Sequence, residues 1–333
     1  MGFNQVGITD IDLSAVAERY QQWLEQGYHG DMAYMTTHGD KRWRPEKLVD
    51  RTIRVISLRI NYWPDDNARD ELDHPENGYV SRYALGRDYH KLVRKRLQKL
   101  ASSIEEIIGE FGYRVFCDSA PVLEKPLAQK AGLGWIGKHS NLINQKDGSW
   151  FFLGELYTDL PLPIDKPVTD DHCGSCRQCI DVCPTRAIVA PFVLDARKCI
   201  SYHTIELKTA IPVEFRKPMG NRIYGCDDCQ LVCPWNKFSR QTREIDFLPR
   251  NNLNKLNLSS SFQWDKETFE SKTEGSAIRR IGHERWLRNI AVALGNADKS
   301  ELVVNALKSR ESNSSALVNE HVKWALDQQL DRP

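Results

Sequence analysis

Hydrophobic residues recur at regular spacings over most of the chain. Apolar residues spaced three and four positions apart predict a long helix over residues 88–111 and a shorter helix over 13–26. Apolar runs, in part alternating with polar residues, predict strands at 52–60, 113–117 and 149–156. Helices and strands that alternate in this way predict an α/β or α+β organisation for the first half of the chain.

The pattern changes twice after this first half. A proline-rich segment at 160–167 predicts a stiff linker, and residues 236–257 show no firm pattern. Three short helical patterns then follow between residues 286 and 326, and they resemble one or two units of an α-solenoid. The chain is therefore expected to be an α+β multidomain protein with domains at 1–162, 163–240 and 241–333.

Composition places few further limits. Hydrophobic residues make up 41% of the 333 positions, charged residues make up 27%, and the net charge is +1, which is ordinary for a soluble globular protein. Bulk charge does not favour nucleic acid, so such contacts must come from local basic patches. No apolar run approaches the ~18 residues of a membrane span. The N-terminus lacks a secretory pattern, so we expect a cytoplasmic protein that does not bind membranes.

Eight of the nine cysteines lie between residues 173 and 234. The first run has the spacing C-x2-C-x2-C-x3-C-P, and the second repeats its ending after a gap of 26 residues. This pattern is typical of two-cluster ferredoxins, in which the fourth cysteine of each run ligates the cluster of the other run. We therefore assign one [4Fe–4S] cluster to Cys173, Cys176, Cys179 and Cys233, and a second to Cys183, Cys199, Cys226 and Cys229.

Zinc and disulfides are the alternatives for these cysteines. Zinc sites usually pair two C-x2-C knuckles, and neither run has that form. Disulfides belong to oxidising compartments. The ninth cysteine, Cys117, is expected to be a buried strand residue.

Three other features have both a structural and a functional interpretation. The basic stretches at 82–99 and 277–288 are either solvated helix faces or phosphate contacts. The glycines within 132–137 follow a helical stretch instead of a strand, so they are not a dinucleotide fingerprint. They favour close approach to a large flat ligand. Asp118 ends a strand, where it is either a turn residue or a carboxylate at the rim of a pocket.

Five stretches, together with both cysteine runs, are similar to the epoxyqueuosine reductase family over nearly the whole chain. They are SRYALGRDYH (81–90), DSAPVLE (118–124), AGLGWIGKH (131–139), GNRIYGCDDCQ (220–230) and EGSAIRR (274–280).

The resemblance implies a cobalamin-binding N-terminal domain, a ferredoxin-like domain with two [4Fe–4S] clusters and a C-terminal HEAT-like helical domain. It implies the last step of queuosine biosynthesis, the cobalamin-dependent two-electron reduction of epoxyqueuosine at the wobble position of tRNA. The implied partners are the tRNA anticodon stem-loop and an external electron donor such as a flavodoxin or ferredoxin system. We expect a monomer.

The resemblance also assigns residues. It makes Asp118 the proton donor, with a pKa raised by the apolar corrin face so that the carboxyl holds a proton near pH 7. The implied cobalamin contacts are Arg42, Ser81, Tyr83, Asp88, Tyr89, His90, Asp118, Gly134, Lys138, Leu142, Leu153, Ser201 and Asp227. The expected tRNA contacts are Thr204, Arg222, Arg279, Arg280, Arg285 and Arg288.

Two other functions are compatible with two clusters. A corrinoid reductive dehalogenase acting on a small molecule shares the same cofactors, but the basic C-terminal helices argue against it. A ferredoxin-type electron carrier would not need the large N-terminal domain with its glycine-rich segment.

Overall fold

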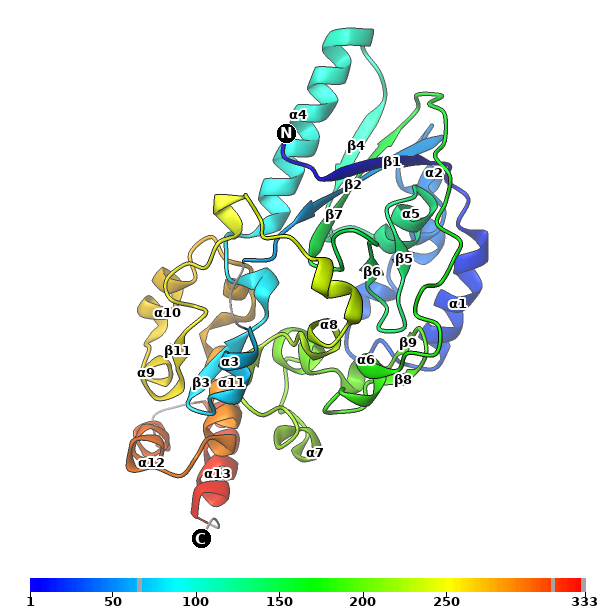
Figure 1. Ribbon diagram of the computed structural model, residues 1–333. Helices are drawn as coiled ribbons and strands as arrows, with labels where there is room; N and C mark the ends of the chain where they lie inside the picture. Colours follow the sequence, from blue (N-terminus) through cyan, green and yellow to red (C-terminus); the bar gives the residue numbers. More distant parts are fainter. Residues whose placement is uncertain (65–67, 313–314, 331–333) are drawn as a thin grey trace.

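The structure of the protein is a computed structural model that describes residues 1–64, 68–312 and 315–330. Its larger sheet is antiparallel throughout, with the strand order β1-β2-β7-β4. These strands are β1 (Gln5–Thr9), β2 (Arg54–Asn61), β7 (Phe151–Thr158) and β4 (Tyr113–Phe116). Figure 1 shows this sheet at one end of the molecule and the C-terminal helices at the other.

Helices cover both faces of this sheet (Figure 1). Helix α4 (Tyr89–Ile108) packs so closely on β7 that a Cβ at Gly154 would lie 2.8 Å from Val93 and 2.9 Å from Leu97. The other face is covered by α5 (Glu124–Lys130), which contacts β1, β2 and β7, and by α2 (Pro45–Leu48). Helix α1 (Ser14–Glu25) lies farther out, and its Trp23 Nε1 donates to the Leu194 carbonyl at 2.7 Å. Successive side chains of a strand point to opposite faces, so Glu155 faces away from α4.

A smaller sheet joins distant parts of the chain. Strand β3 (Asn77–Val80) lies between β10 (Arg222–Tyr224), which is parallel to it, and β11 (Leu256–Asn257), which is antiparallel. Val80 and Leu85 belong to the same hydrophobic core as α11 (Gly282–Asn296). Strand β3 of the first segment pairs with β10 of the second and β11 of the third. The expected domain boundaries at 162/163 and 240/241 therefore do not separate independent hydrophobic cores.

The remaining elements are short, apart from the last helix. The strands are β5 (Trp135–Ile136), β6 (Leu142–Ile143), β8 (Ile188–Ala190) and β9 (Val193–Leu194). The α-helices are α3 (Ala68–Asp73), α6 (Gln178–Asp181), α7 (Val213–Arg216), α8 (Asp228–Leu231), α9 (Leu258–Phe262), α10 (Lys266–Lys272), α12 (Glu301–Lys308) and α13 (Ala316–Leu330). Single turns that matter below are η3 (Arg82–Ala84), η5 (Tyr202–Glu206), η6 (Pro234–Phe238) and η8 (Ala277–Ile281).

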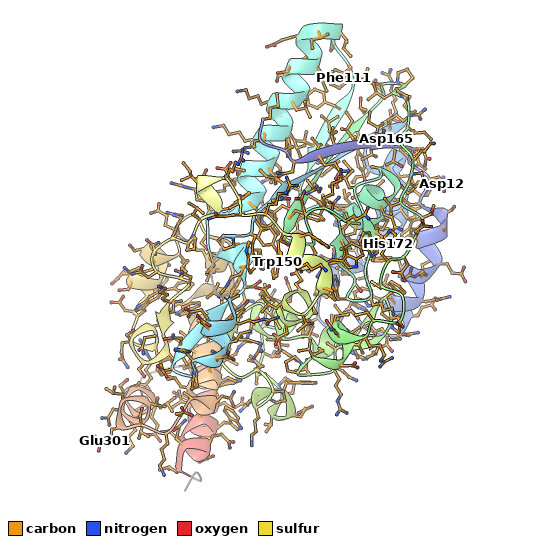
Figure 2. The ribbon with its side chains drawn as sticks, viewed as in Figure 1. Asp12, Phe111, Trp150, Asp165, His172 and Glu301 are labelled. Atoms are coloured by element: carbon orange, nitrogen blue, oxygen red, sulfur yellow. The ribbon has the colours of Figure 1, made fainter. Side chains whose placement is uncertain are left out.

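A second core lies under α4. It contains Leu97, Phe152 and Trp150, whose exposed fraction is 2%, and Figure 2 shows Trp150 near the centre of the molecule. The helices expected at 13–26 and 88–111 are confirmed as α1 and α4. Helix α4 ends earlier than expected because Gly109, its C-cap, has a φ of 85° outside the helical region.

Candidate active site

A cavity of about 1220 Å³ lies between the large sheet and the C-terminal helical part. It exceeds the ≈ 300–1,000 Å³ that is usual for pockets of small ligands. Its wall includes Phe152 and Leu153 of β7, Tyr89 and His90 of α4, and Arg280 of η8. The site is therefore large enough for a bulky cofactor and part of a substrate.

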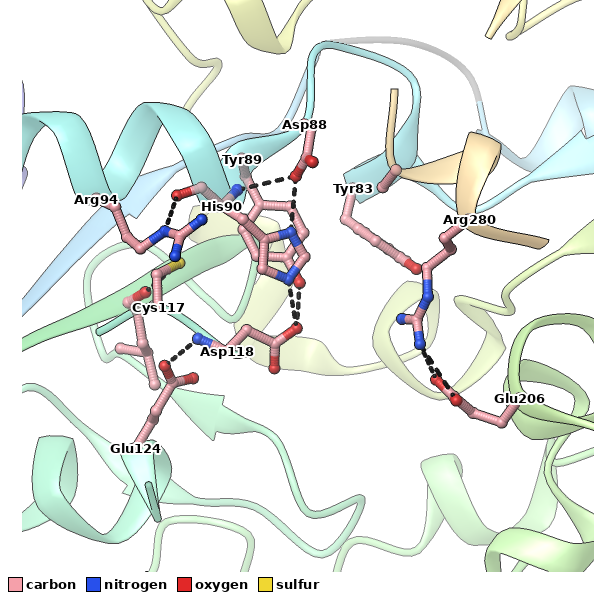
Figure 3. A network of polar contacts seen from close by, with 12 residues as sticks. Tyr83, Asp88, Tyr89, His90, Arg94, Cys117, Asp118, Glu124, Glu206 and Arg280 are labelled. Carbon is pink, nitrogen blue, oxygen red and sulfur yellow. Dashed lines mark hydrogen bonds and ion pairs between the residues drawn. The ribbon is translucent and has the colours of Figure 1, made fainter. Parts of the chain in front are cut away.

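Asp118 lies in this cavity at the centre of a hydrogen-bonded group (Figure 3). The Tyr89 hydroxyl donates to Asp118 Oδ2, and His90 Nε2 lies 3.2 Å from the same oxygen. His90 Nδ1 lies 2.7 Å from Asp88 Oδ1. Asp88 also caps α4 by accepting a hydrogen bond from the His90 backbone. His90 is thus held between two carboxylates.

The charges in this group favour a proton on the imidazole. Burial lowers the pKa of His90, but hydrogen bonds to Asp118 and Asp88 outweigh it and raise the pKa to about 9. For Asp118, burial raises the pKa, yet hydrogen bonds from His90 and Tyr89 and the charge of His90 leave it lowered. The Asp118 side chain is also 53% exposed to the cavity, which favours its ionised form. At neutral pH the group is an imidazolium beside a carboxylate.

Most residues expected to contact cobalamin line this one cavity. They are Arg42, Ser81, Tyr83, Asp88, Tyr89, His90, Asp118, Leu142, Leu153, Ser201 and Asp227. They come from segments up to 185 positions apart, between Arg42 and Asp227. Contact with the cofactor itself stays a prediction.

Asp227 joins the cavity wall to the cysteine segment. It follows Cys226, and its carboxylate accepts hydrogen bonds from the Tyr79 hydroxyl at 2.8 Å, the Ser81 hydroxyl at 2.5 Å and the Arg82 backbone N–H at 2.8 Å. A fully buried carboxylate with three donors is satisfied. This interaction fixes the cysteine loop to the segment that leads into α4.

The eight clustered cysteines form two sets in space. Cys173, Cys176, Cys179 and Cys233 surround one cavity of about 310 Å³. Burial and then the charges of the three neighbouring thiolates raise the pKa of Cys179 to about 11. Cys183, Cys199, Cys226 and Cys229 also interact electrostatically with one another. Thiolates that converge in this way need a bound cationic group to be stable together.

The two sets border different cavities. Cys226 lines the large cavity, as does Asp118. The cavity of the other set is lined by Trp235 and by Phe238, which is 44% exposed. None of the nine cysteines, all of them among the described residues, forms a disulfide, which contradicts the disulfide alternative.

Comparison with known proteins agrees with this arrangement. The family model described as epoxyqueuosine reductase QueG, DUF1730 matches residues 42–119, and the 4Fe-4S double cluster binding domain matches residues 172–236. An epoxyqueuosine reductase of Pseudomonas aeruginosa is 58% identical and covers 98% of this chain and 91% of its own. That of Escherichia coli is 57% identical and covers 100% and 87%.

The chain belongs to the epoxyqueuosine reductase family. Its fold is the mixed α/β fold of solved members. An epoxyqueuosine reductase from Streptococcus thermophilus has a TM-score of 0.89 at 26% identity and covers 100% of this chain and 88% of its own. One crystallised with a tRNA-Tyr epoxyqueuosine-modified stem loop also has a TM-score of 0.89 at 26% identity, with coverage of 99% and 87%. The alternatives of a dehalogenase and an electron carrier are not favoured.

Two residues expected to contact cobalamin lie elsewhere. A Cβ at Gly134 would lie 2.1 Å from the Ile143 carbonyl oxygen. The glycine is therefore required by the close approach of β5 and β6, not by a ligand. Lys138 Nζ donates to the Cys176 carbonyl at 2.9 Å and also to that of Gly174. Neither residue lines the large cavity, so their cobalamin contacts stay predictions, and Lys138 supports the loop of the first cysteine set.

Several residues expected to contact tRNA are internal. Arg288 is fully buried and donates to the carbonyl oxygens of Leu207 and Thr209 at 2.8 and 2.7 Å, and also to that of His203. Thr204 is fully buried and donates to the Ile200 carbonyl at 2.8 Å. Phosphate contacts by these two side chains are excluded in this structure because neither reaches the surface.

Arg222 and Arg285 are also engaged within the protein. Arg222 Nε donates to Asp228 Oδ2 at 2.6 Å, beside Cys226. Arg285 donates to three carbonyl oxygens, among them that of Ile205 at 2.8 Å. Arg279 and Arg280 instead line the large cavity. The basic stretch thus divides into arginines that hold η5 in place and arginines that face the cavity.

The structure adds charged cavity residues that had no predicted role. They are Glu124, Lys125 and Glu206. Glu124 stands in the DSAPVLE stretch, so a role near Asp118 could have been suspected from that motif. Lys125 and Glu206 gave no signal, because isolated charges usually face solvent. Lys91 and Arg94 of the basic stretch 82–99 also line the cavity. Among the described residues, no helix is long and apolar enough to span a membrane.

The position of Cys233 gives a test of the crossed cysteine sets. Cys233→Ala should remove or convert the cluster of Cys173, Cys176 and Cys179, and iron content should fall by up to roughly half. The other cluster should keep its EPR signal after reduction. Cys117→Ala is the matched control, because its thiol bonds only the Leu153 carbonyl at 3.3 Å. Loss of the cluster of Cys226 and Cys229 instead would contradict the assignment.

Proposed function

We propose that this chain reduces epoxyqueuosine to queuosine at the wobble position of a tRNA anticodon. The observation that carries the proposal is the Asp88–His90–Asp118 group in a large cavity that also borders Cys226. The group that would supply a proton and a cysteine that would hold an electron-carrying cluster thus line the same cavity. A crystallised relative binds an epoxyqueuosine-modified tRNA stem loop, which supports the same substrate class here.

We propose cobalamin as the cofactor of this cavity. The cavity is wide, and its wall combines Phe152, Leu142 and Leu153 with polar groups, as expected for a flat macrocycle with polar substituents. Ser81, Tyr83, Ser201 and the other predicted contacts in the cavity would hold it. Bound and reduced, cobalamin would supply the two electrons that the epoxide takes up.

The cysteine sets support a path for those electrons. The Cys173 set lines its own cavity together with the exposed Phe238, and Cys226 of the second set lines the large cavity. We propose that an external donor, such as a flavodoxin or ferredoxin system, reduces the first cluster, and that the second passes electrons inward. We also propose a monomer in the cytoplasm, in which α11, α12 and α13 form a HEAT-like unit of the C-terminal domain.

The proton is supplied by the group around His90. Removing the epoxide oxygen as water requires protons as well as electrons, because an alkoxide leaves poorly. From the sequence we expected Asp118 to be protonated, but its pKa is lowered and the proton resides on His90. We infer that Asp118 points at the substrate oxygen and delivers a proton that His90 holds. Asp88 orients the imidazole from the other side.

The pH dependence tests this proton source. With tRNA carrying epoxyqueuosine, the pre-reduced enzyme should convert it in a single anaerobic turnover at neutral pH. The rate should fall as pH rises through about 9, where His90 loses its proton. The charge of His90 also contributes stability that is complete below its ordinary pKa of 6.5 and lost as pH rises through about 9. No conversion at neutral pH would contradict the proposed function, and a rate unchanged to pH 10 would exclude His90.

Asp118→Asn separates chemistry from cofactor binding. The amide keeps the size of the side chain but cannot carry the proton, so single-turnover rates should fall by about 10²–10⁴-fold. Cobalamin content and both clusters should be retained, and tRNA should bind as before. A variant with full cofactor content and the wild-type rate would remove Asp118 from the mechanism. Loss of cobalamin together with activity would make Asp118 a structural residue of the cavity.

We propose that Arg279 and Arg280 contact tRNA phosphates at the cavity mouth. Arg280 Nη2 lies 2.9 Å from Glu206 Oε1, and its side chain is 49% exposed. Such an arginine can keep this ion pair and still donate to a phosphate oxygen. Arg279 is exposed beside it.

Neutralising this pair should weaken tRNA binding. Arg279→Gln with Arg280→Gln should lower affinity and reduce the slope of log K against log salt by roughly two. Lys323→Gln, an exposed lysine on α13, is the matched control. Arg288→Gln should instead lower the melting temperature, because it leaves buried carbonyl groups without a donor. Equal tRNA affinity at all salt concentrations would make Arg279 and Arg280 a solvated helix end.

A further inference from the structure

Glu155 is an unusual residue for the centre of a sheet. It lies in the middle of β7 with an exposed fraction of 0%, flanked by β2 and β4. The Ser57 hydroxyl of β2 donates to its Oε1 at 3.2 Å. An isolated buried carboxylate is strongly disfavoured, so this group needs a further partner or a proton.

That partner is Glu124, at the start of α5. The two carboxyl groups interact: Glu124 raises the pKa of Glu155, and Glu155 Oε2 is buried without a hydrogen-bond partner among the described residues. Glu124 Oε1 accepts the backbone N–H of Asp118, and Glu155 Oε1 accepts the Ser57 hydroxyl. This leaves one oxygen of each carboxyl for their contact. Two neighbouring ionised carboxylates would repel each other, and a proton shared between them would remove that repulsion.

The titration behaviour of the pair agrees with this geometry. Burial, and then the charge of Asp118, raise the pKa of Glu124 to about 7. Burial, and then the charge of Glu124, raise the pKa of Glu155 well above its ordinary range. The pair therefore keeps a proton under neutral conditions, while Glu124 can still accept the hydrogen bond from Asp118.

Asp118 depends on this hydrogen bond for its position. Its φ is 56°, in the left-handed region that residues other than glycine seldom adopt. Figure 3 shows its backbone N–H directed at Glu124 while its carboxylate points toward His90. A backbone hydrogen bond from the Ser119 N–H to the Cys117 carbonyl at 2.6 Å also spans the turn. The side chain of Asp118 itself is half exposed to the cavity.

We propose that Glu124, hydrogen-bonded through a shared proton to Glu155, is the positioning residue that holds the Asp118 loop against His90. The proposal rests on the role of Asp118 proposed above. A solved relative from Bacillus subtilis has its catalytic loop swung out of the active site, so a catalytic loop on this fold can take a second position. In this chain, loss of the Glu124 contact would release the loop.

The titration of His90 reports the position of Asp118 without any turnover. His90 faces Asp88 before α4, Asp118 after β4 and the Tyr89 hydroxyl, while Lys125 on α5 and Arg280 on η8 line the same cavity. Asp118 is a main cause of the raised pKa of His90. A departure of Asp118 must therefore lower that pKa, whereas a general loss of stability at Glu124 would leave it unchanged in the folded protein.

The experiment uses the full chain with both clusters loaded and isotope-labelled histidine, followed by NMR as pH is varied. In the wild type, His90 should titrate near 9. Glu124→Met fills the same space without an acceptor, so the His90 pKa should fall toward 6.5 and the single-turnover rate should fall within the range of about 10²–10⁴-fold. Glu124→Ala serves the same purpose if the methionine variant does not load its clusters.

The conservative Glu124→Gln variant completes the test. Its amide oxygen can accept from Asp118 while its NH₂ group donates to Glu155, so the raised His90 pKa and most of the rate should be restored. Glu106→Met, an exposed carboxylate on α4, is the matched control and should change neither. A His90 pKa near 9 in both Glu124→Met and Glu124→Ala would overturn the proposal.

A second result would also overturn it. If Glu124→Gln keeps the His90 pKa near 9 but is as slow as Glu124→Met, then Glu124 carries a proton and does not act by positioning. Failure of the proposed function is distinguishable, because the His90 titration needs neither cobalamin nor tRNA. In that case the wild type would be inactive on epoxyqueuosine-containing tRNA while the Glu124 variants still shift His90.

Discussion

The buried carboxylate of Asp227 is the interaction on which the candidate site depends. It stands next to Cys226, and it accepts hydrogen bonds from Tyr79, Ser81 and the Arg82 backbone. One side chain thus connects the cysteine loop to the segment that leads directly into α4. Because α4 begins with the acid group around His90, the distance between redox centre and proton source is set by this contact and by the β3–β10 pairing beside it.

The acid group illustrates how neighbouring charges decide which residue holds a proton. Burial alone would keep Asp118 protonated and His90 neutral. Two carboxylates around one imidazole reverse both tendencies, so the proton moves to His90. Behind Asp118, burial and a neighbouring negative charge raise the pKa of both Glu124 and Glu155, in keeping with the proton proposed to be shared between them. The Asp118 carboxylate is therefore held by the positively charged His90, and the Asp118 backbone N–H is held by Glu124.

The cavity also explains why the chain is folded across its apparent domain boundaries. If the ligand site lay between domains that move independently, the distance between a bound cofactor and the catalytic acid would not be fixed. Here β3 pairs with β10 and β11, so residues of the first, second and third segments share one small sheet. Arg288 adds to this by hydrogen-bonding the carbonyl groups of residues 203–209 from α11. The cavity wall is consequently a single packed unit.

The sequence by itself determined the local features of this protein. Cysteine spacing indicated two crossed sets, and periodicity located α1 and α4, because both depend only on short stretches of chain. It could not separate Arg288 from Arg279, since the two have the same chemistry and differ only in burial. Nor could it identify Glu155, an acid in an apolar strand whose partner lies 31 positions away at Glu124. Contacts between distant segments decide these roles, and only the tertiary structure brings those segments together.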